Sequence, residues 1–373
     1  MSSFTLPIID LELFTRDKTA SEAINECQKV ANALREYGAL LVRNSGVKEE
    51  DNARFLDLLE DYYAQPLEVK LKDARPDLGY QVGVTPEFTE EPKCHRDINC
   101  QKLISQLPEE IRPLPISGPD PKWRFFWRIG EIPKATNYPR LNADPVIPEG
   151  SLSRNHYVFL PKLTEPFSLI AFKDKWPNIM DEWGNQMHRV VLGVAEMASV
   201  GFGMHAGELP DLTKNGPHLL APTGSDLDKY GKIGTIFAGF HYDLNFLTIH
   251  GKSRYPGLHI WPHNGDVKMQ VRVPDGHLLV QAGKQLEWIT GGEVKAGFHE
   301  VVVTKDTIKS IEDAKKTRPD RPLWRISSTF FLHVASDQIL QPLEPFKPNL
   351  SHYPPTFAGD QVKHELGLIE LMK

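Results

Sequence analysis

The sequence predicts a mixed α and β protein whose second half is a β-sandwich or jelly roll, and three observations carry this prediction. The first 66 residues alternate between short apolar runs and amphipathic helical segments. A long helical segment follows in the middle of the chain. From residue 217 onward, short apolar runs are cut by glycine-rich turns, which is typical of sandwiches and jelly rolls.

Two helices are predicted in the N-terminal region. Residues 21–38 (SEAINECQKVANALREYG) place apolar side chains on one face, with Ser21 as the expected N-cap. Gly38 is the expected stop, because glycine readily adopts the left-handed conformation that ends helices. Residues 49–66 (EEDNARFLDLLEDYYAQP) predict a second helix that ends before its final proline.

Three strands are expected in the N-terminal half. Residues 6–14 (LPIIDLELF) and 39–46 (ALLVRNSG) read as short buried strands on either side of the first helix. Residues 123–129 (WRFFWRI) also read as a strand, inside a proline-rich stretch from about 75 to 150. On this strand Arg124, Phe126 and Arg128 share one face, since side chains alternate along a strand.

The remaining elements are a long helix, a set of short strands and a closing helix. Residues 164–204 form the long helical segment, and residues 359–373 (GDQVKHELGLIELMK) the closing helix. The short strands lie between them.

The composition indicates a soluble globular protein. Of its 373 residues, 40% are hydrophobic and 25% charged, and the formal charge is −6. Lys/Arg blocks, a run of 18 apolar residues and a secretory signal are all absent from the sequence, so we expect neither nucleic acid nor membrane partners. The small number of cysteines (Cys27, Cys94 and Cys100) favours free thiols in a reducing compartment, hence a cytoplasmic location. A zinc site at Cys94, His95 and Cys100 is the alternative for these residues.

The stretch GFHYDLNFLTIHG sets His241 and Asp243 two apart in an otherwise apolar run. On a strand these side chains share a face, and a buried imidazole and carboxylate must be paired or bind a metal. A hydrogen-bonded pair without metal is the plainer interpretation. A second His-x-Asp, His95 and Asp97, lies in a charge-rich stretch without strand character and is expected to have no metal role.

A third ligand is available from another predicted strand. His299 begins a strand 56 residues after Asp243. Two imidazoles and one carboxylate with open positions are diagnostic of non-haem Fe(II) oxygenases. Downstream, Arg325 and Ser327 (RISS) could bind a carboxylate, because a guanidinium pairs with it in a bidentate manner. A structural salt bridge is the alternative role for Arg325. The other histidines of this half (His250, His259, His263 and His277) are expected to be core or surface residues.

With these residues in order, the chain resembles the 2-oxoglutarate- and Fe(II)-dependent dioxygenases, in the branch that includes isopenicillin N synthase and many plant oxidases. The family pattern of His-x-Asp, a distal His and Arg-x-Ser falls on the five residues above. The stretches LPIID, LREYGALLVRNSGV and PLEVKLK also resemble the family's N-terminal module.

The resemblance implies a double-stranded β-helix with Fe(II) held by His241, Asp243 and His299. Arg325 and Ser327 would bind the far carboxylate of 2-oxoglutarate, and O2 would be the second co-substrate. The implied reaction oxidises a small organic metabolite by hydroxylation, desaturation or cyclisation, and releases succinate and CO2.

The resemblance also implies a domain division and a substrate pocket. Residues 5–150 would form the N-terminal module, 151–340 the double-stranded β-helix with its supporting helix, and 341–373 a C-terminal extension. The residues expected to border the substrate pocket, by likeness to relatives, are Arg124, Phe126, Arg128 and Phe331.

Several features depart from the family pattern. Arg325 lies 26 residues after His299, a longer separation than in relatives. The intervening segment 305–322 is expected to be a polar surface excursion. Glu300 follows the distal histidine where relatives often have Arg, and Ala221 precedes a proline where many have Tyr.

Three other functions remain open at the level of sequence. A co-substrate-free oxidase of the isopenicillin N synthase type would carry the same pattern. A zinc hydrolase could use the same three ligands with an open position, but it has no use for Arg325 and Ser327. A binding protein that keeps the jelly roll without chemistry is the third.

Overall fold

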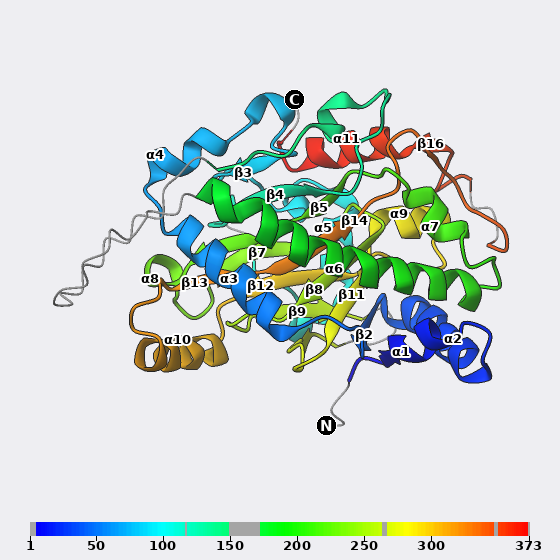
Figure 1. Cartoon of the computed structure of the whole chain (residues 1–373), viewed down its shortest axis with the longest axis horizontal. Helices are drawn as coiled ribbons and strands as arrows, with labels where there is room; N and C mark the ends of the chain where they lie inside the picture. Colours follow the sequence, from blue (N-terminus) through cyan, green and yellow to red (C-terminus); the bar gives the residue numbers. More distant parts are fainter. Residues whose placement is uncertain (1–4, 116–117, 149–171, 263–266, 347–349, 372–373) are drawn as a thin grey trace.

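The structure is a computed structural model in which two β-sheets lie at the centre and helices surround them (Figure 1). The described residues are 5–115, 118–148, 172–262, 267–346 and 350–371.

The larger sheet has ten strands: β1 (Ile8–Asp10), β2 (Ala39–Arg43), β3 (Gly83–Thr85), β4 (Trp123–Ile129), β5 (His218–Leu220), β6 (Thr223–Asp226), β8 (Leu247–Gly251), β11 (Leu278–Ala282), β13 (Trp324–Ile326) and β14 (Ser328–Leu332). Their order is β1-β2-β11-β8-β14-β5-β4-β6-β13, and β3 pairs with β4 beside this path. Strands from both halves of the sequence therefore share one sheet.

The smaller sheet has four strands in the order β10-β9-β12-β7: β7 (Ile236–His241), β9 (Leu258–Trp261), β10 (Met269–Gln270) and β12 (Phe298–Val302). A separate pair joins β15 (Ile339–Leu340) to β16 (Thr356–Phe357). From β7 to β9, and again from β10 to β13, consecutive strands alternate between these two sheets. The predicted mixed α and β class with a jelly-roll core is confirmed.

The helices are α1 (Leu11–Arg16), α2 (Ser21–Tyr37), α3 (Glu49–Tyr63), α4 (Leu67–Lys70), α5 (Ile98–Gln106), α6 (Phe172–Gly201), α7 (Glu208–Thr213), α8 (Leu227–Tyr230), α9 (Lys284–Ile289), α10 (Lys305–Thr317) and α11 (Ala358–Leu368). Within the described ranges, no helix is both long and apolar enough to cross a membrane.

Helix α6 covers the larger sheet and contacts β4, β5, β8 and β14. Its buried side chains recur every three or four residues, as in Trp176, Met180, Trp183 and Met187, which is the spacing of one helix face. Gly184 permits the close approach, since a Cβ there would lie 2.4 Å from Ile129 Cδ1. The larger sheet is therefore supported from behind by a long apolar contact.

Several local predictions need correction. Of residues 6–14, only Ile8–Asp10 form a strand, because the Asp10 side chain accepts a hydrogen bond from Glu12 N and starts helix α1. Ser21 is not an N-cap: it is the first residue of α2, and Ala20 precedes it without a side-chain cap. Gly38 does end that helix, with φ 64°.

The predicted long helix is shorter where it can be followed: helix α6 occupies 172–201, while 164–171 lie outside the described residues. The segment 305–322 is largely polar and exposed, as expected, and its first thirteen residues fold into α10. Thr304 caps that helix in a reciprocal capping box with Thr307.

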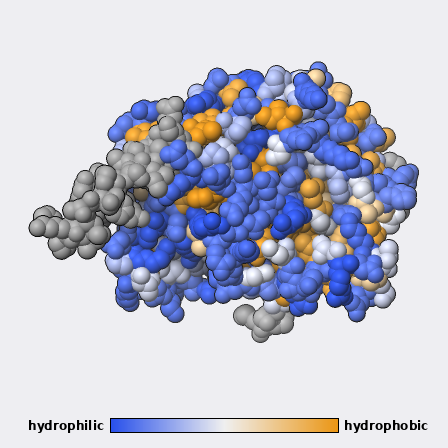
Figure 2. All heavy atoms as spheres, in the orientation of Figure 1, coloured by the Kyte–Doolittle hydropathy of each residue, from blue (hydrophilic) through white to orange (hydrophobic). Residues whose placement is uncertain are grey.

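Hydrophilic residues predominate on the face shown in Figure 2, and apolar residues occur there in small groups. A surface of this kind is ordinary for a globular protein, since polar atoms never cover it completely. The features that bear on function lie between the sheets.

Candidate active site

Two strands of the smaller sheet bring the predicted metal ligands together. His241 is the last residue of β7 and lies directly opposite His299 of β12 in the antiparallel register. Asp243 follows two residues after the end of β7, in the connection to β8, and not within a strand as predicted. The pairing of β7 with β12 thus explains why residues far apart in sequence meet.

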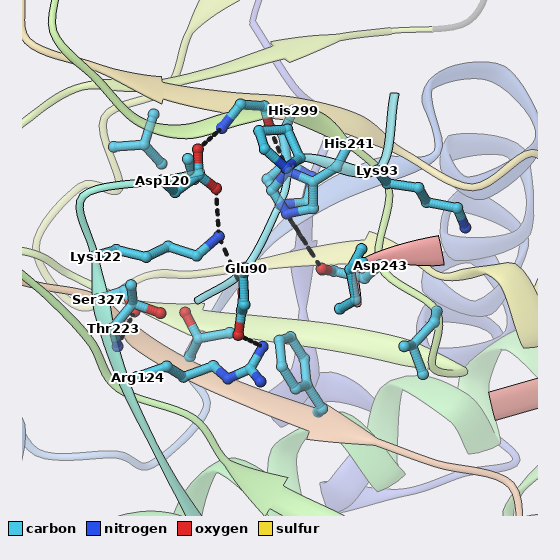
Figure 3. A pocket seen from close by; sticks show the side chains of 18 of the residues that line it. Glu90, Lys93, Asp120, Lys122, Arg124, Thr223, His241, Asp243, His299 and Ser327 are labelled. Atoms are coloured by element: carbon cyan, nitrogen blue, oxygen red, sulfur yellow. Dashed lines mark hydrogen bonds and ion pairs between the residues drawn. The ribbon is translucent and has the colours of Figure 1, made fainter. Parts of the chain in front are cut away.

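The three side chains form a compact cluster (Figure 3). The Nε2 atoms of His241 and His299 each lie 3.8 Å from Asp243 Oδ1, and the two imidazole centroids are 4.2 Å apart. One ligand atom from each residue lies within 4.8 Å of the other two. In the part of the chain that the structure describes, this is the one such group of histidine, cysteine and acidic residues.

Hydrogen bonds behind the cluster orient each ligand. His241 Nδ1 lies 2.6 Å from Gly239 O, and His299 Nδ1 lies 3.2 Å from Gly297 O. A carbonyl accepts, so each Nδ1 carries the proton and each Nε2 presents a lone pair to the cluster. Thr248 Oγ1 donates to Asp243 Oδ2 at 2.6 Å and leaves Oδ1 facing the histidines. Supporting bonds of this kind are what metal ligands in proteins have.

The electrostatic environment favours the protonation states that a metal requires. Burial, and next the neighbouring His299, lower the pKa of His241, so its imidazole is neutral near pH 7. Burial alone would raise the pKa of Asp243, but attraction to His299 and His241 and the hydrogen bond from Thr248 together lower it. The donor set and its protonation state therefore fit a divalent metal such as Fe(II).

The other histidines of this half are not part of the cluster. His250 is partly buried beside it, where Nδ1 lies 3.0 Å from Thr329 Oγ1 and Nε2 lies 3.1 Å from Gln281 Oε1. Burial lowers the pKa of His250 to about 4, so it is neutral. His259, on β9, bonds Gly257 O, His277 bonds Asp275 O, and His263 lies outside the described residues.

The second His-x-Asp has structural roles. The Asp97 carboxylate caps helix α5 by accepting from Asn99 N and Cys100 N. The His95 side chain is 48% exposed and pairs with Glu91. Neither residue belongs to the cluster.

Replacing both His95 and Asp97 by alanine should therefore leave Fe(II) affinity unchanged. The loss of an N-cap should lower the free energy of unfolding by about 1 kcal/mol. Metal titration together with thermal unfolding of the double variant checks both statements. A large fall in Fe(II) affinity would show that the wrong pair had been assigned.

The prediction of free thiols is wrong for two of the three cysteines. Cys94 and Cys100 form a disulfide, with Cα atoms 5.1 Å apart, and Cys27 is free and buried. The turn into helix α5 at Asp97 brings these residues within the usual bridging distance. Their sulfurs are bonded to each other, so the alternative zinc site with His95 is not formed either.

Arg325 and Ser327 line the same cavity as the metal cluster, a space of about 180 Å³. Arg325 is on β13, is 7% exposed, and donates from Nε to Tyr255 O at 3.1 Å. Burial lowers its pKa to about 10. Ser327 lies between β13 and β14, and its Oγ accepts from Thr223 N at 2.9 Å.

The structure describes no ion pair for Arg325. No described acidic residue that lines this cavity pairs with it. Asp243 lies beside His241 and His299, and Glu90 pairs with Lys122 and Arg124. The salt-bridge alternative is thus not realised among the described residues.

Of the predicted substrate residues, Arg124, Phe126 and Phe331 line the cavity. Phe126 and Phe331 meet edge to face with centroids 6.1 Å apart, and they pack with Ala221. Arg128 does not line it: although buried, it turns to Asn142 Oδ1 and the Glu131 carbonyl.

A row of charged side chains lines one wall of the cavity, and it was not predicted from the sequence. Figure 3 shows Lys122 between Asp120 and Glu90, and Arg124 beside Glu90. The Lys122 Nζ distances are 2.7 Å to Asp120 and 3.2 Å to Glu90, and Arg124 lies 2.5 Å from Glu90. The Asp120 carboxylate also accepts from Gly239 N on β7. The sequence signal for this wall was the spacing of Asp120, Lys122 and Arg124, charged residues two apart that lead into the apolar strand β4.

Arg124 keeps unused hydrogen-bonding capacity in this wall. Its Nε and Nη2 are buried, with no hydrogen-bond partner in the described part of the chain. Its guanidinium carbon lies 3.9 Å from the centroid of the Phe126 ring.

The C-terminal helix contributes the opposite wall, which the sequence did not predict. Glu365 of α11 forms a buried ion pair with Lys93, and both line the cavity with Leu366 and Ile369. The Lys93 ammonium also lies 3.5 Å from the centroid of the Tyr242 ring. Helix α11 is therefore held against the site by a pair of opposite charges.

Comparison with known families matches two stretches of the chain. Residues 6–131 match the profile "non-haem dioxygenase in morphine synthesis N-terminal", and residues 222–334 match the profile "2OG-Fe(II) oxygenase superfamily". The second match contains all five residues of the sequence pattern.

Among curated proteins, a match is the 2-oxoglutarate-dependent dioxygenase 21, chloroplastic, of Oryza sativa subsp. japonica. It is 28% identical over 124 residues, which are 33% of this chain and 37% of that protein. The alignment thus spans little more than a third of the relative.

Solved structures share the fold over nearly the whole chain. A full-length Neurospora crassa protein in complex with alpha-KG has a TM-score of 0.68 at 15% identity and covers 98% of this chain and 97% of its own. The dioxygenase for auxin oxidation of rice has a TM-score of 0.62 at 14% identity, and the match covers 97% of this chain and 95% of the rice protein. The predicted double-stranded β-helix is confirmed.

Proposed function

Because the chain belongs to the 2OG-Fe(II) oxygenase superfamily, we propose that it uses Fe(II), 2-oxoglutarate and O2 to oxidise a small organic metabolite. Succinate and CO2 are the co-products, and hydroxylation, desaturation or cyclisation is the change in the metabolite. The enzyme class follows from the family, and the assignment of individual residues is our proposal.

One observation carries the proposal of a dicarboxylate co-substrate. Arg325 is a buried guanidinium without an acidic partner among the described residues, and it opens onto the cavity that holds the metal cluster. A buried charge is costly unless paired. A carboxylate bound from solution would pair it, and the Ser327 hydroxyl proton can add one hydrogen bond.

The metal-binding part of the proposal rests on the donor set. His241, Asp243 and His299 would hold the iron through Nε2, Oδ1 and Nε2. Bound Fe(II) would supply the redox chemistry that activates O2 towards a C–H bond. The chain orients these donors through Gly239 O, Gly297 O and Thr248. A zinc hydrolase would leave Arg325 without a function.

The prime substrate is proposed to lie between the apolar pair Phe126 and Phe331 and the charged wall. The wall is already neutral overall, because Lys122 and Arg124 face Asp120 and Glu90. The unused N–H groups of Arg124 therefore suit a neutral acceptor such as a carbonyl or hydroxyl oxygen of the substrate.

Replacing Phe126 by alanine should raise KM for an accepted prime substrate by about tenfold, corresponding to about 1.4 kcal/mol of lost apolar contact. KM for 2-oxoglutarate should stay the same, because the ring lies on the substrate side. Steady-state kinetics with each compound varied in turn measures the two effects. Equal rises in both KM values would place the ring beside the co-substrate instead.

Binding of 2-oxoglutarate to the Mn(II)-loaded protein, measured by calorimetry, tests the proposed function without turnover. We expect one site per chain whose affinity falls when EDTA removes the metal. Glutarate lacks the 2-oxo group, so it should bind more weakly and independently of metal. No binding of 2-oxoglutarate in the presence of metal would favour a co-substrate-free oxidase.

The domain division and the location are also proposals. We propose that residues 5–150 form the N-terminal module, 151–340 the catalytic core and 341–373 a C-terminal extension, although the larger sheet contains strands from both the module and the core.

A cytoplasmic location is proposed from the small number of cysteines. The Cys94–Cys100 disulfide argues against this location, because disulfides are rare in cytoplasmic proteins. Alkylation of protein isolated from cells would decide, since both thiols react only if the compartment is reducing.

A further inference from the structure

A second cavity, of about 340 Å³, lies behind the proposed co-substrate site. Four segments line it: the end of β8 with its connection to β9, the residues after β10, helix α10, and residues 325–328 of β13 and β14. Its lining includes Tyr255, Val273, Lys309, Ser310 and Asp313.

This cavity and the catalytic cavity share four lining residues, which are His250, Leu258, Arg325 and Ser327. The two residues proposed to bind the co-substrate carboxylate are therefore reached from both sides. His250 is fixed in this wall by its bonds to Thr329 and Gln281. Leu258 is the apolar member of these four residues and is only partly buried.

Helix α10 makes the outer side of the second cavity. Its Ile311 and Ala314 are buried in a cluster with Phe237 and Tyr255. Thr307 Oγ1 donates to Pro256 O at 3.0 Å and ties the helix to the connection that lines the cavity. The segment that separates His299 from Arg325 therefore packs against the core and forms a wall of the cavity.

The charges along this route suit a dianion. Three of its basic residues have acidic partners: Arg272 pairs with Asp306, Lys252 with Asp275, and Arg254 with Glu60 and Asp57. Lys309 at the outer end and Arg325 at the inner end have no ion pair within the described chain. Among the described residues that line the cavity, Asp313 is the one acid without an ion pair. The two basic residues and one acid that lack ion pairs therefore leave a net positive charge along the path.

We propose that the second cavity is a channel through which 2-oxoglutarate enters and succinate leaves, separate from the opening used by the prime substrate. The proposal rests on the proposed function, since it requires that Arg325 binds the co-substrate. The prime-substrate side is walled by α11 through Glu365, Leu366 and Ile369. Figure 1 places α10 and α11 at opposite edges of the molecule. Co-substrate could then exchange while the prime substrate stays bound.

Substitutions that fill the second cavity with a large side chain test the channel. Ser310→Trp from α10 and Val273→Trp from the facing segment each place a large ring in the second cavity. Glu312→Trp is the matched control, because Glu312 is an exposed residue of the same helix that does not line the cavity. Stopped-flow tryptophan fluorescence follows binding of 2-oxoglutarate to each Mn(II)-loaded protein, and calorimetry gives Kd.

Both plugged variants should bind and release 2-oxoglutarate about tenfold more slowly than the control, within the range that mutations produce in association rates. Their Kd should stay within about twofold of the wild type, because the final binding site is unchanged and both rates fall together. Rates equal to those of the control in both plugged variants, with melting temperatures that show folding, would overturn the channel. A changed Kd at an unchanged association rate would overturn it as well, since the ring would then disturb the site itself. Failure of the wild type to bind 2-oxoglutarate would overturn the proposed function together with the channel.

Discussion

Replacing His299 by alanine is expected to abolish turnover and to lower Fe(II) affinity by at least about a hundredfold. Loss of a residue that merely supports a metal ligand costs about 10- to 100-fold in metal affinity, and His299 is itself one of three proposed ligands. Its Nε2 lies 3.8 Å from Asp243 Oδ1, and its partner across the strand pair is His241. The same outcome is expected for alanine at His241 or Asp243.

Iron content and activity of the purified variant measure this effect, with circular dichroism to show that the fold persists. His259→Ala is the matched control, because His259 lies on the neighbouring strand β9 and its ring bonds Gly257 O, away from the metal cluster. The control should keep wild-type iron. Iron and turnover near wild type in His299→Ala would mean that another residue supplies the third ligand.

Replacing Arg325 by alanine is expected to raise the Kd for 2-oxoglutarate by roughly a hundredfold or more. Hydrogen bonds to charged groups contribute about 1.5 to 3 kcal/mol each. Losing two of them corresponds to at least two factors of ten, at about 1.4 kcal/mol per factor. Arg325→Lys keeps the charge but not the paired donors, and it should fall between the wild type and alanine.

Ser327→Ala is the graded comparison for Arg325. It removes a single donor, so its effect on 2-oxoglutarate affinity should be smaller. It also leaves Thr223 N without its acceptor, which should lower the free energy of unfolding by about 1 to 3 kcal/mol. Affinity for the prime substrate should change little in either variant. Overlapping 2-oxoglutarate titrations for the wild type and Arg325→Ala would show that another cation binds the co-substrate.

The metal cluster could be predicted from the sequence because strand geometry is local and regular. His241 and Asp243 stand two apart at the end of a strand, and His299 stands in another strand that must pair within the same small sheet. The prediction that Asp243 lies within the strand was inaccurate, since β7 ends at His241. The unusual separation of His299 and Arg325 has a structural explanation: helix α10 fills it and the chain returns to β13 in register with β6.

The rest of the site depends on contacts that no local pattern encodes. Glu90 and Asp120 come from irregular segments whose approach is decided by tertiary packing, and Glu365 reaches Lys93 from the C-terminal helix. The Cys94–Cys100 disulfide likewise depends on how the chain turns into α5. Arg128 was expected in the pocket because it shares a strand face with Arg124 and the matching strand in relatives borders the pocket, but its long side chain turns to Asn142 instead.

The most direct test of the proposed chemistry is a product analysis of candidate metabolites incubated with the protein, Fe(II), 2-oxoglutarate and air. Mass spectrometry follows each metabolite, and succinate is measured in the same samples. We predict that an accepted metabolite gains one oxygen or loses two hydrogens, with a matching amount of succinate, and that Zn(II) in place of Fe(II) supports neither change. Turnover with Zn(II), or oxidation of an accepted metabolite without any consumption of 2-oxoglutarate, would contradict the proposed function.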